Sequence, residues 1–68
     1  MIYKVNFKEL NKYVDNWCEH LLNDTRRLLY AYNPDYKIYV GVDNTTDNCW
    51  VEEFKTEKQV INWLKGND

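Results

Sequence analysis

A proline-containing turn between two strand-like runs is the feature that most constrains the fold of this chain. The stretch Asn33-Pro34-Asp35-Tyr36 combines residue types that favour a reverse turn, and it separates the runs RRLLYAY and KIYVGV. A third run, CWVEEF, follows the polar segment DNTTDN. The runs are rich in β-branched and aromatic residues, so we expect three antiparallel strands joined by two hairpins.

Residues with helical periodicity precede these runs. Apolar residues recur at helical spacing from Leu10 to Leu22, and Asn6 with Glu9 forms a capping box ahead of them. The pattern predicts a helix from about residue 7 to about residue 22. Residues 2–5 are then extended, as a short edge strand or as an arm.

A second helical segment follows the third run. Thr56 and Gln59 form another capping box, and Gly66 is suited to end the helix. The apolar side of this helix consists of Val60, Ile61 and Leu64, with Trp63 at its border.

Together these elements predict one small α+β domain that spans residues 1–68. We expect a three-stranded antiparallel sheet flanked by two helices, in the order α-β-β-β-α, with the N-terminal segment as a possible further short strand. The chain has 68 residues, which is enough for one hydrophobic core. Its three Trp, six Tyr and two Phe indicate an aromatic-rich core, a partner or self-association as the source of added stability.

The apolar stretches of the chain are short. The longest runs, LLYAY and IYVGV, have five residues each, against about 20 needed to span a bilayer. The first residues, MIYKVNFKEL, contain no apolar stretch followed by small residues, so we expect no signal peptide. These features favour a cytoplasmic protein with no membrane partner, in which Cys18 and Cys49 are free thiols.

Counting outward from the first turn separates the strand residues into two faces. If Pro34 and Asp35 are the central residues of a two-residue loop, Ala31 faces Ile38. The same register places Tyr30 opposite Tyr39. A second hairpin closed symmetrically about DNTTDN places Gly41 opposite Trp50, whose indole can lie over the bare backbone.

One predicted face is aliphatic and the other is aromatic. We expect the first helix to cover the aliphatic face, which carries Leu29, Ala31, Ile38, Val40, Val42, Cys49 and Val51. The aromatic face carries Leu28, Tyr30, Tyr32, Tyr39, Trp50 and Phe54, with Lys37 and Glu52 at its margins.

The aromatic face has two interpretations. It is core if the second helix, the N-terminal segment or a second copy covers it. It is a binding platform if it stays open, because a contiguous aromatic patch on a protein surface is a common partner site. The candidate partner-binding residues are Tyr30, Tyr32, Tyr39, Trp50, Glu52 and Phe54.

The sequence offers no pattern typical of catalysis or metal binding. Cys18 and His20 lie two positions apart on the predicted helix and so point in different directions. Glu52 and Glu53 are adjacent on a strand and face opposite sides, which excludes an acid–base pair. The chain also lacks serine, and His20 is its one histidine. We therefore expect no enzymatic activity, no cofactor and no metal.

Aromatic rings bordered by carboxylates are typical of a surface that binds a basic protein site. The expected function is a small non-enzymatic protein-binding module, specifically an inhibitor from a phage or mobile element that blocks a host or defence protein, in the manner of an anti-CRISPR protein. A single-stranded nucleic-acid-binding module and an obligate structural subunit are the alternatives. Nucleic acid is disfavoured because acidic residues surround the rings. A weak homodimer through the aromatic face is also expected.

Overall fold

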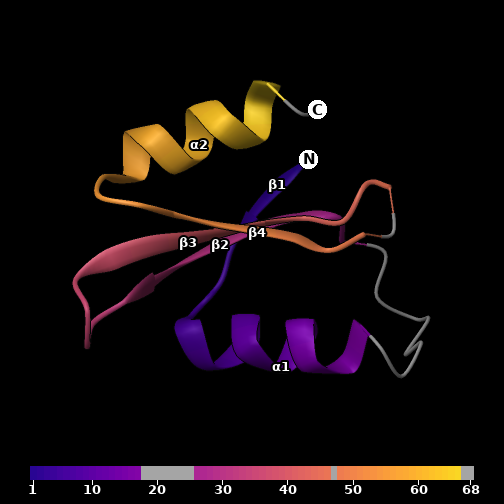
Figure 1. Ribbon diagram of the computed structural model, residues 1–68, viewed down its shortest axis with the longest axis horizontal. Coiled ribbons are helices and arrows are strands. Elements are labelled where there is room, and N and C mark those ends of the chain that lie inside the picture. The colour runs from indigo at the N-terminus through magenta and orange to yellow at the C-terminus, as the bar shows by residue number, and fades with distance from the viewer. Residues whose placement is uncertain (18–25, 47, 67–68) are drawn as a thin grey trace.

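The computed structural model describes residues 1–17, 26–46 and 48–66 of the chain. Helix α1 lies on one face of a central sheet and helix α2 lies on the other (Figure 1). The sheet has four strands in the order β1-β2-β3-β4, so the predicted α+β fold is confirmed, with the N-terminal segment as a fourth strand. The elements are β1 (Ile2–Lys4), α1 (Phe7–Trp17), β2 (Leu28–Asn33), β3 (Ile38–Asp43), β4 (Trp50–Phe54) and α2 (Glu57–Gly66).

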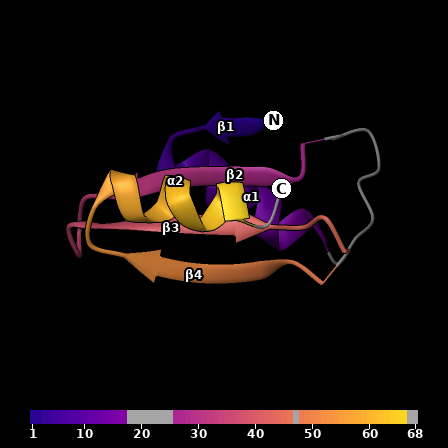
Figure 2. The same cartoon turned by 90° about the horizontal axis from the view of Figure 1, so that it is seen from above.

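Strand β1 makes the sheet mixed rather than purely antiparallel. It pairs in parallel with β2, with Tyr3 beside Leu29, and the N–H of Val5 donates to the carbonyl of Tyr30 at 3.0 Å. The other two pairings, β2 with β3 and β3 with β4, are antiparallel. Strands β1 and β4 therefore form the two opposite edges of the sheet (Figure 2).

Helix α1 begins where its capping residues predict. The side-chain oxygen of Asn6 accepts a hydrogen bond from the N–H of Glu9 at 2.7 Å, which satisfies one free donor of the first turn. The carboxylate of Glu9 also accepts from Arg26, at 2.8 Å. The helix is described as far as Trp17, and its predicted extension to residue 22 lies outside the described residues.

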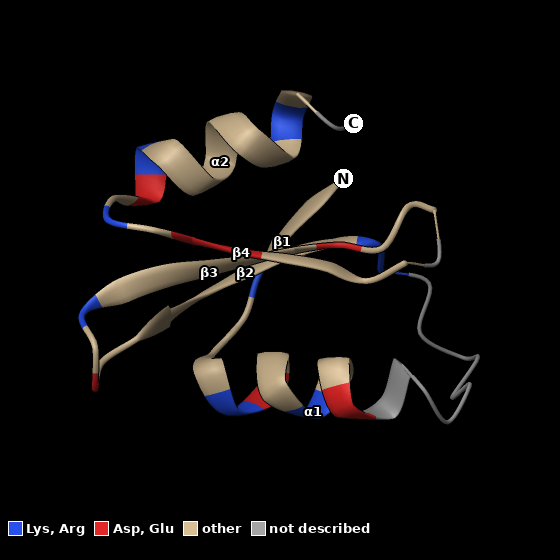
Figure 3. Ribbon diagram, viewed as in Figure 1, with Lys and Arg blue, Asp and Glu red and all other residues tan. Residues whose placement is uncertain are grey.

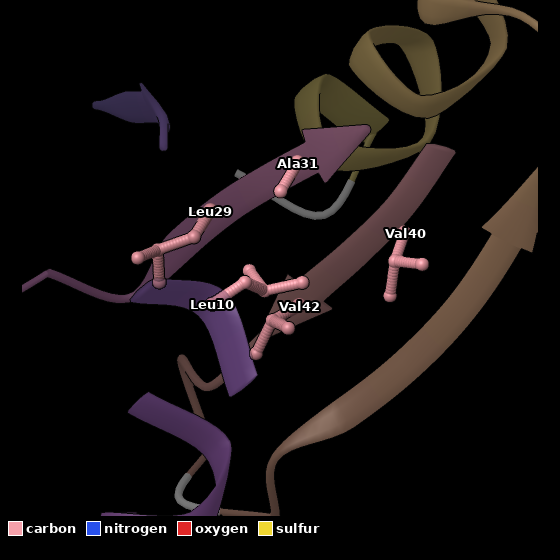
Figure 4. Close-up of a cluster of buried hydrophobic side chains, with 5 residues drawn as sticks. All are labelled: Leu10, Leu29, Ala31, Val40 and Val42. Carbon is pink, nitrogen blue, oxygen red and sulfur yellow. The ribbon is translucent and has the colours of Figure 1, made fainter. Parts of the chain in front are cut away.

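Helix α1 covers the aliphatic face over β2 and β3, as predicted, but leaves Val51 of β4 46% exposed. Leu10 is fully buried and is directed at the strand residues of this face (Figure 4). The buried residues of this cluster are Leu10, Leu29, Ala31, Val40 and Val42.

Helix α2 covers the centre of the aromatic face. Both halves of its capping box form, since Gln59 N–H donates to Thr56 Oγ1 and Thr56 N–H donates to Gln59 Oε1, each at 3.2 Å. Val60 and Leu64 are completely buried in a cluster with Leu28 and Tyr30. The centre of the aromatic face is therefore core, because the second helix packs on it.

The predicted register of the first hairpin is wrong by two residues. Ala31 pairs with Val40 rather than Ile38, because the loop contains four residues, Pro34 to Lys37. Two-residue hairpin loops require a positive φ at their first position, which the ring of Pro34 forbids. The left-handed residue is instead Lys37, with φ 54°. A shift of two residues preserves the side-chain alternation, so both predicted faces are retained.

The second hairpin is shifted by the same amount. Val42 pairs with Val51 rather than Cys49, and Gly41 pairs with Glu52 rather than Trp50. Cys49 has φ 51°, which removes it from the strand ladder.

The predicted indole cover of Gly41 comes from a different tryptophan. A Cβ on Gly41 would lie 3.1 Å from a ring carbon of Trp63 and 2.7 Å from Val60 Cγ2. Gly41 therefore lets α2 approach the sheet closely, and the indole beside its bare backbone is that of Trp63 rather than the predicted Trp50.

Candidate functional site

Helix α2 removes Tyr30 from the predicted binding platform. This side chain is 6% exposed, and its hydroxyl donates to Glu57 Oε2 at 2.8 Å. The same carboxylate oxygen lies 2.9 Å from the ammonium nitrogen of Lys4 on β1. Tyr30 thus belongs to a cluster of three polar groups that joins β1, β2 and α2.

The three groups of this cluster stabilise one another's native protonation states. Hydrogen bonds from Lys4 and then Tyr30 hold the pKa of Glu57 below its ordinary value. Burial, followed by the hydrogen bond to Glu57, raises the pKa of Tyr30. The hydrogen bond and the charge of Glu57 raise the pKa of Lys4. The arrangement is that of a structural clamp at the margin of α2.

A row of aromatic rings crosses the face of the sheet on which α2 packs. Tyr32 pairs with Tyr39 across β2 and β3, and Tyr39 pairs with Phe54 across β3 and β4. The ring centroids of Tyr32 and Tyr39 are 5.0 Å apart, and those of Phe54 and Trp63 are 5.5 Å apart. Tyr32 is 40% exposed, whereas Tyr39 and Phe54 are half-buried. One end of this row therefore reaches the surface at Tyr32.

The two most exposed of the large hydrophobic side chains on the sheet lie on the edge strand β4. Trp50 is 58% exposed and Val51 is 46% exposed. Glu52 and Glu53 are also exposed, and they make the acidic stretch of β4 in Figure 3. We call the set of Trp50, Val51, Glu52, Glu53 and Phe54 the β4 edge surface.

This exposure follows from the position of β4 in the sheet. Helix α1 packs on β2, away from β4, and α2 packs across β2, β3 and part of β4. Where β4 meets α2, an open depression of about 650 Å³ is lined by Glu53, Phe54, Lys55, Gln59 and Asn62. Among the described residues, the outer side of β4 is therefore unpaired and the side chains of Trp50, Val51, Glu52 and Glu53 are exposed, whereas Phe54 is half-buried against Trp63.

The structure divides the six candidate residues into three groups. Trp50, Glu52 and Phe54 lie together on the α2 side of β4, and Tyr32 and Tyr39 lie opposite each other on β2 and β3. Tyr30 is buried beneath α2.

The sequence analysis did not include Val51 and Glu53 among the candidate binding residues, because both belong to the face that receives the first helix. Their position at a sheet edge could have been predicted from the order of the elements. The last strand of a meander lies at a sheet edge unless a further strand pairs with it.

No family model, curated protein or solved structure matched this chain. Among residues 1–17, 26–46 and 48–66, no group of three or more His, Cys, Asp or Glu side chains is placed to hold a metal ion. The helices in that part of the chain are too short and too polar to cross a bilayer.

Proposed function

We propose that this chain is a small non-enzymatic protein-binding module whose binding site is the β4 edge surface. The observation that carries the proposal is the exposure of Trp50, whose side chain is 58% exposed on an edge strand. Tryptophan is enriched among the residues that dominate binding energy at protein interfaces. An exposed indole beside a half-exposed valine is costly to leave in water, and a partner protein would bury both.

The charge beside Trp50 favours a basic partner. Glu52 and Glu53 extend from the two faces of β4, and both are exposed. Carboxylates around an apolar centre provide charge complementarity to lysine and arginine, and they accelerate encounter with a positively charged surface. The same charges repel the phosphates of nucleic acids, so a protein is the favoured ligand.

The specific role in our proposal is inhibition. Proteins that handle nucleic acids carry basic sites, and a small acidic module can block such a site by occupying it. A host or defence protein that meets a phage or mobile element is a target of this kind. The exposed carboxylates of Glu52 and Glu53 on the β4 edge surface support this role.

A position-specific crosslinking experiment tests the proposal. A photoreactive phenylalanine analogue replaces Trp50 in one version of the chain and Tyr36 in the control version. Tyr36 is 76% exposed but lies in the β2–β3 loop, at the other end of the sheet from Trp50 (Figure 1). Each version is irradiated in a bacterial lysate.

The proposal predicts a basic protein that crosslinks from position 50 and not from position 36. Excess unmodified chain should abolish this product, and the Glu52→Lys substitution should weaken it. Equal products from both positions, or products consisting only of nucleic acid, would contradict the proposal.

A further inference from the structure

We infer that β4 binds its partner by strand addition, with an extended basic segment of the partner pairing main chain to main chain along the outer edge of β4. This inference rests on the proposed function, and it adds the mode of binding and the chemistry of the bound segment. Three observations carry it: the direction of the backbone groups of β4, the closure of both ends of its edge, and the position of its two glutamates.

The hydrogen-bond pattern of the sheet identifies the outward backbone groups of β4. The N–H of Asn44 donates to the carbonyl of Arg27 at 2.7 Å, so residues 40, 42 and 44 bond toward β2. Residues of an antiparallel strand alternate in direction, so positions 39, 41 and 43 bond toward β4. Their partners are residues 54, 52 and 50. Val51 and Glu53 therefore direct their N–H and C=O groups outward.

Both ends of this outward edge are closed by the chain itself. The N–H of Lys55 donates to Gln59 Oε1 at 3.1 Å. At the other end, Cys49 leaves the strand with φ 51°, and its N–H donates to Asn44 Oδ1 at 3.1 Å. Among the described residues, no strand pairs with the outer side of β4. The open part of the edge is thus the stretch around Val51 and Glu53, which is long enough for a short strand.

The side chains of β4 define the residues that would bind beside them. Cross-strand neighbours lie on the same face, so a residue opposite Glu52 lies on the α2 side and one opposite Glu53 lies on the α1 side. Two consecutive basic residues would place one cation on each face. Their neighbours opposite Val51 and Trp50 would be β-branched and aromatic. In the antiparallel direction, the partner segment reads basic, basic, β-branched, aromatic.

A second copy of the chain fits this edge poorly. Two β4 strands side by side would bring Glu52 and Glu53 of both copies into one small interface, and like charges across strands are destabilising. The opposite edge of the sheet is less suitable for strand addition, because β1 has only three residues. A heterologous basic segment is therefore the occupant that the charges favour.

A labelled peptide provides the first test. Its central sequence is Val-Lys-Arg-Val-Tyr, and its fluorescence anisotropy is followed as the whole chain is added. We expect saturable binding that added salt weakens. The control peptide has the same side chains but carries N-methyl groups on the backbone amides that face β4. It should bind at least about tenfold more weakly, because it cannot donate to the edge.

Three variants provide the second test. Val51→Pro removes an outward N–H at a position where an edge strand tolerates proline, while Val51→Thr retains it. Proline should weaken peptide binding about tenfold and threonine should not. The double variant Glu52→Lys with Glu53→Lys should lose the basic peptide and bind a version with Glu-Glu in place of Lys-Arg. Circular dichroism confirms that each variant is folded, and the N-methyl comparison does not depend on any variant.

Each outcome has a defined meaning. Equal affinity of the methylated and unmethylated peptides would overturn strand addition and leave the proposed function intact. No binding of the basic peptide would overturn the inference about the bound segment, while the crosslink from position 50 would still test the proposed function separately. A dimer in sedimentation that Val51→Pro dissociates, with no peptide binding, would show that the occupant is a second copy.

Discussion

Tyr30 of β2 donates a 2.8 Å hydrogen bond to Glu57 of α2, and this contact joins the first turn of the helix to the centre of the aromatic face. The consequence is a division of the aromatic residues. The ring of Tyr30 is core, whereas the indole of Trp50 stays at the edge of the sheet with 58% of its surface exposed. The two residues share a face in sequence pattern but have different roles in the folded chain.

The first prediction compares alanine substitutions at these two positions. Tyr30→Ala should reduce the free energy of unfolding by about 3–5 kcal/mol, since it removes a buried aromatic ring. Trp50→Ala should change it by no more than about 0.5 kcal/mol, because the ring is exposed. Urea unfolding monitored by circular dichroism measures both values. Similar losses at the two positions would mean that Trp50 is also core.

The second prediction concerns pH and the cluster of Lys4, Tyr30 and Glu57. The lowered pKa of Glu57 stabilises the fold above its ordinary value of about 4.5, and this contribution is lost as the pH falls through the lower folded-state pKa. The raised pKa values of Tyr30 and Lys4, from 10.0 and 10.5, stabilise the fold below those values. That contribution is lost as the pH rises through the folded-state pKa values.

Melting temperatures of the wild type and Glu57→Gln across the pH range test this account. The wild type should be the more stable protein at neutral pH, and its advantage should shrink both at acid pH below about 4.5 and at alkaline pH above about 10. A difference that stays constant at all pH values would show that the three groups are not coupled.

The third prediction uses the two glycines of the chain as a matched pair. Gly41→Ala should destabilise the fold by about 1–3 kcal/mol, because the added methyl group would meet Val60 and Trp63. Gly66→Ala has no atom within 4 Å of the added group, so it should be neutral or slightly stabilising at the end of α2. Thermal unfolding measures the stability of both variants. Equal stability of the two would contradict the close approach of α2 to the sheet at Gly41.

The fourth prediction concerns the four-residue loop between β2 and β3. Lys37 has φ 54°, a conformation in which a side chain costs about 1–2 kcal/mol. Lys37→Gly should therefore stabilise the chain by about 0.5–1 kcal/mol, after the entropic cost of glycine. Tyr36→Gly is the control, because Tyr36 has no positive φ, and it should destabilise. If Lys37→Gly and Tyr36→Gly changed the free energy of unfolding in the same direction, the result would argue against the observed loop geometry.

Local sequence signals predicted the elements of this fold well. Asn6 and Thr56 cap the two helices at the predicted positions, because a cap is decided by residues within one turn of each other. The register was missed by two residues because the ring of Pro34 is incompatible with the two-residue loop assumed for it. The faces were still correct, since the side-chain period of a strand is two.

The candidate site was harder to predict because it depends on contacts between distant segments. The position of α2 over Tyr30 follows from Gly41, Val60 and Trp63, which belong to two elements and meet only in the folded chain. Sequence alone could identify the aromatic residues but not which of them α2 covers. The direction of backbone hydrogen-bonding groups also alternates with a period of two, so the outward direction of Val51 is unchanged by the two-residue error in register.

Amide hydrogen exchange along β4 tests the central claim, that this strand is an open binding edge, most directly. In the free chain, the amides of Val51 and Glu53 should exchange rapidly because they point outward, whereas those of Glu52 and Phe54 should be protected by β3. Addition of the basic peptide should slow exchange at Val51 and Glu53 by at least about tenfold and leave Glu52 and Phe54 unchanged. Protection of Val51 and Glu53 in the free chain, or rapid exchange of both at saturating peptide, would contradict the account.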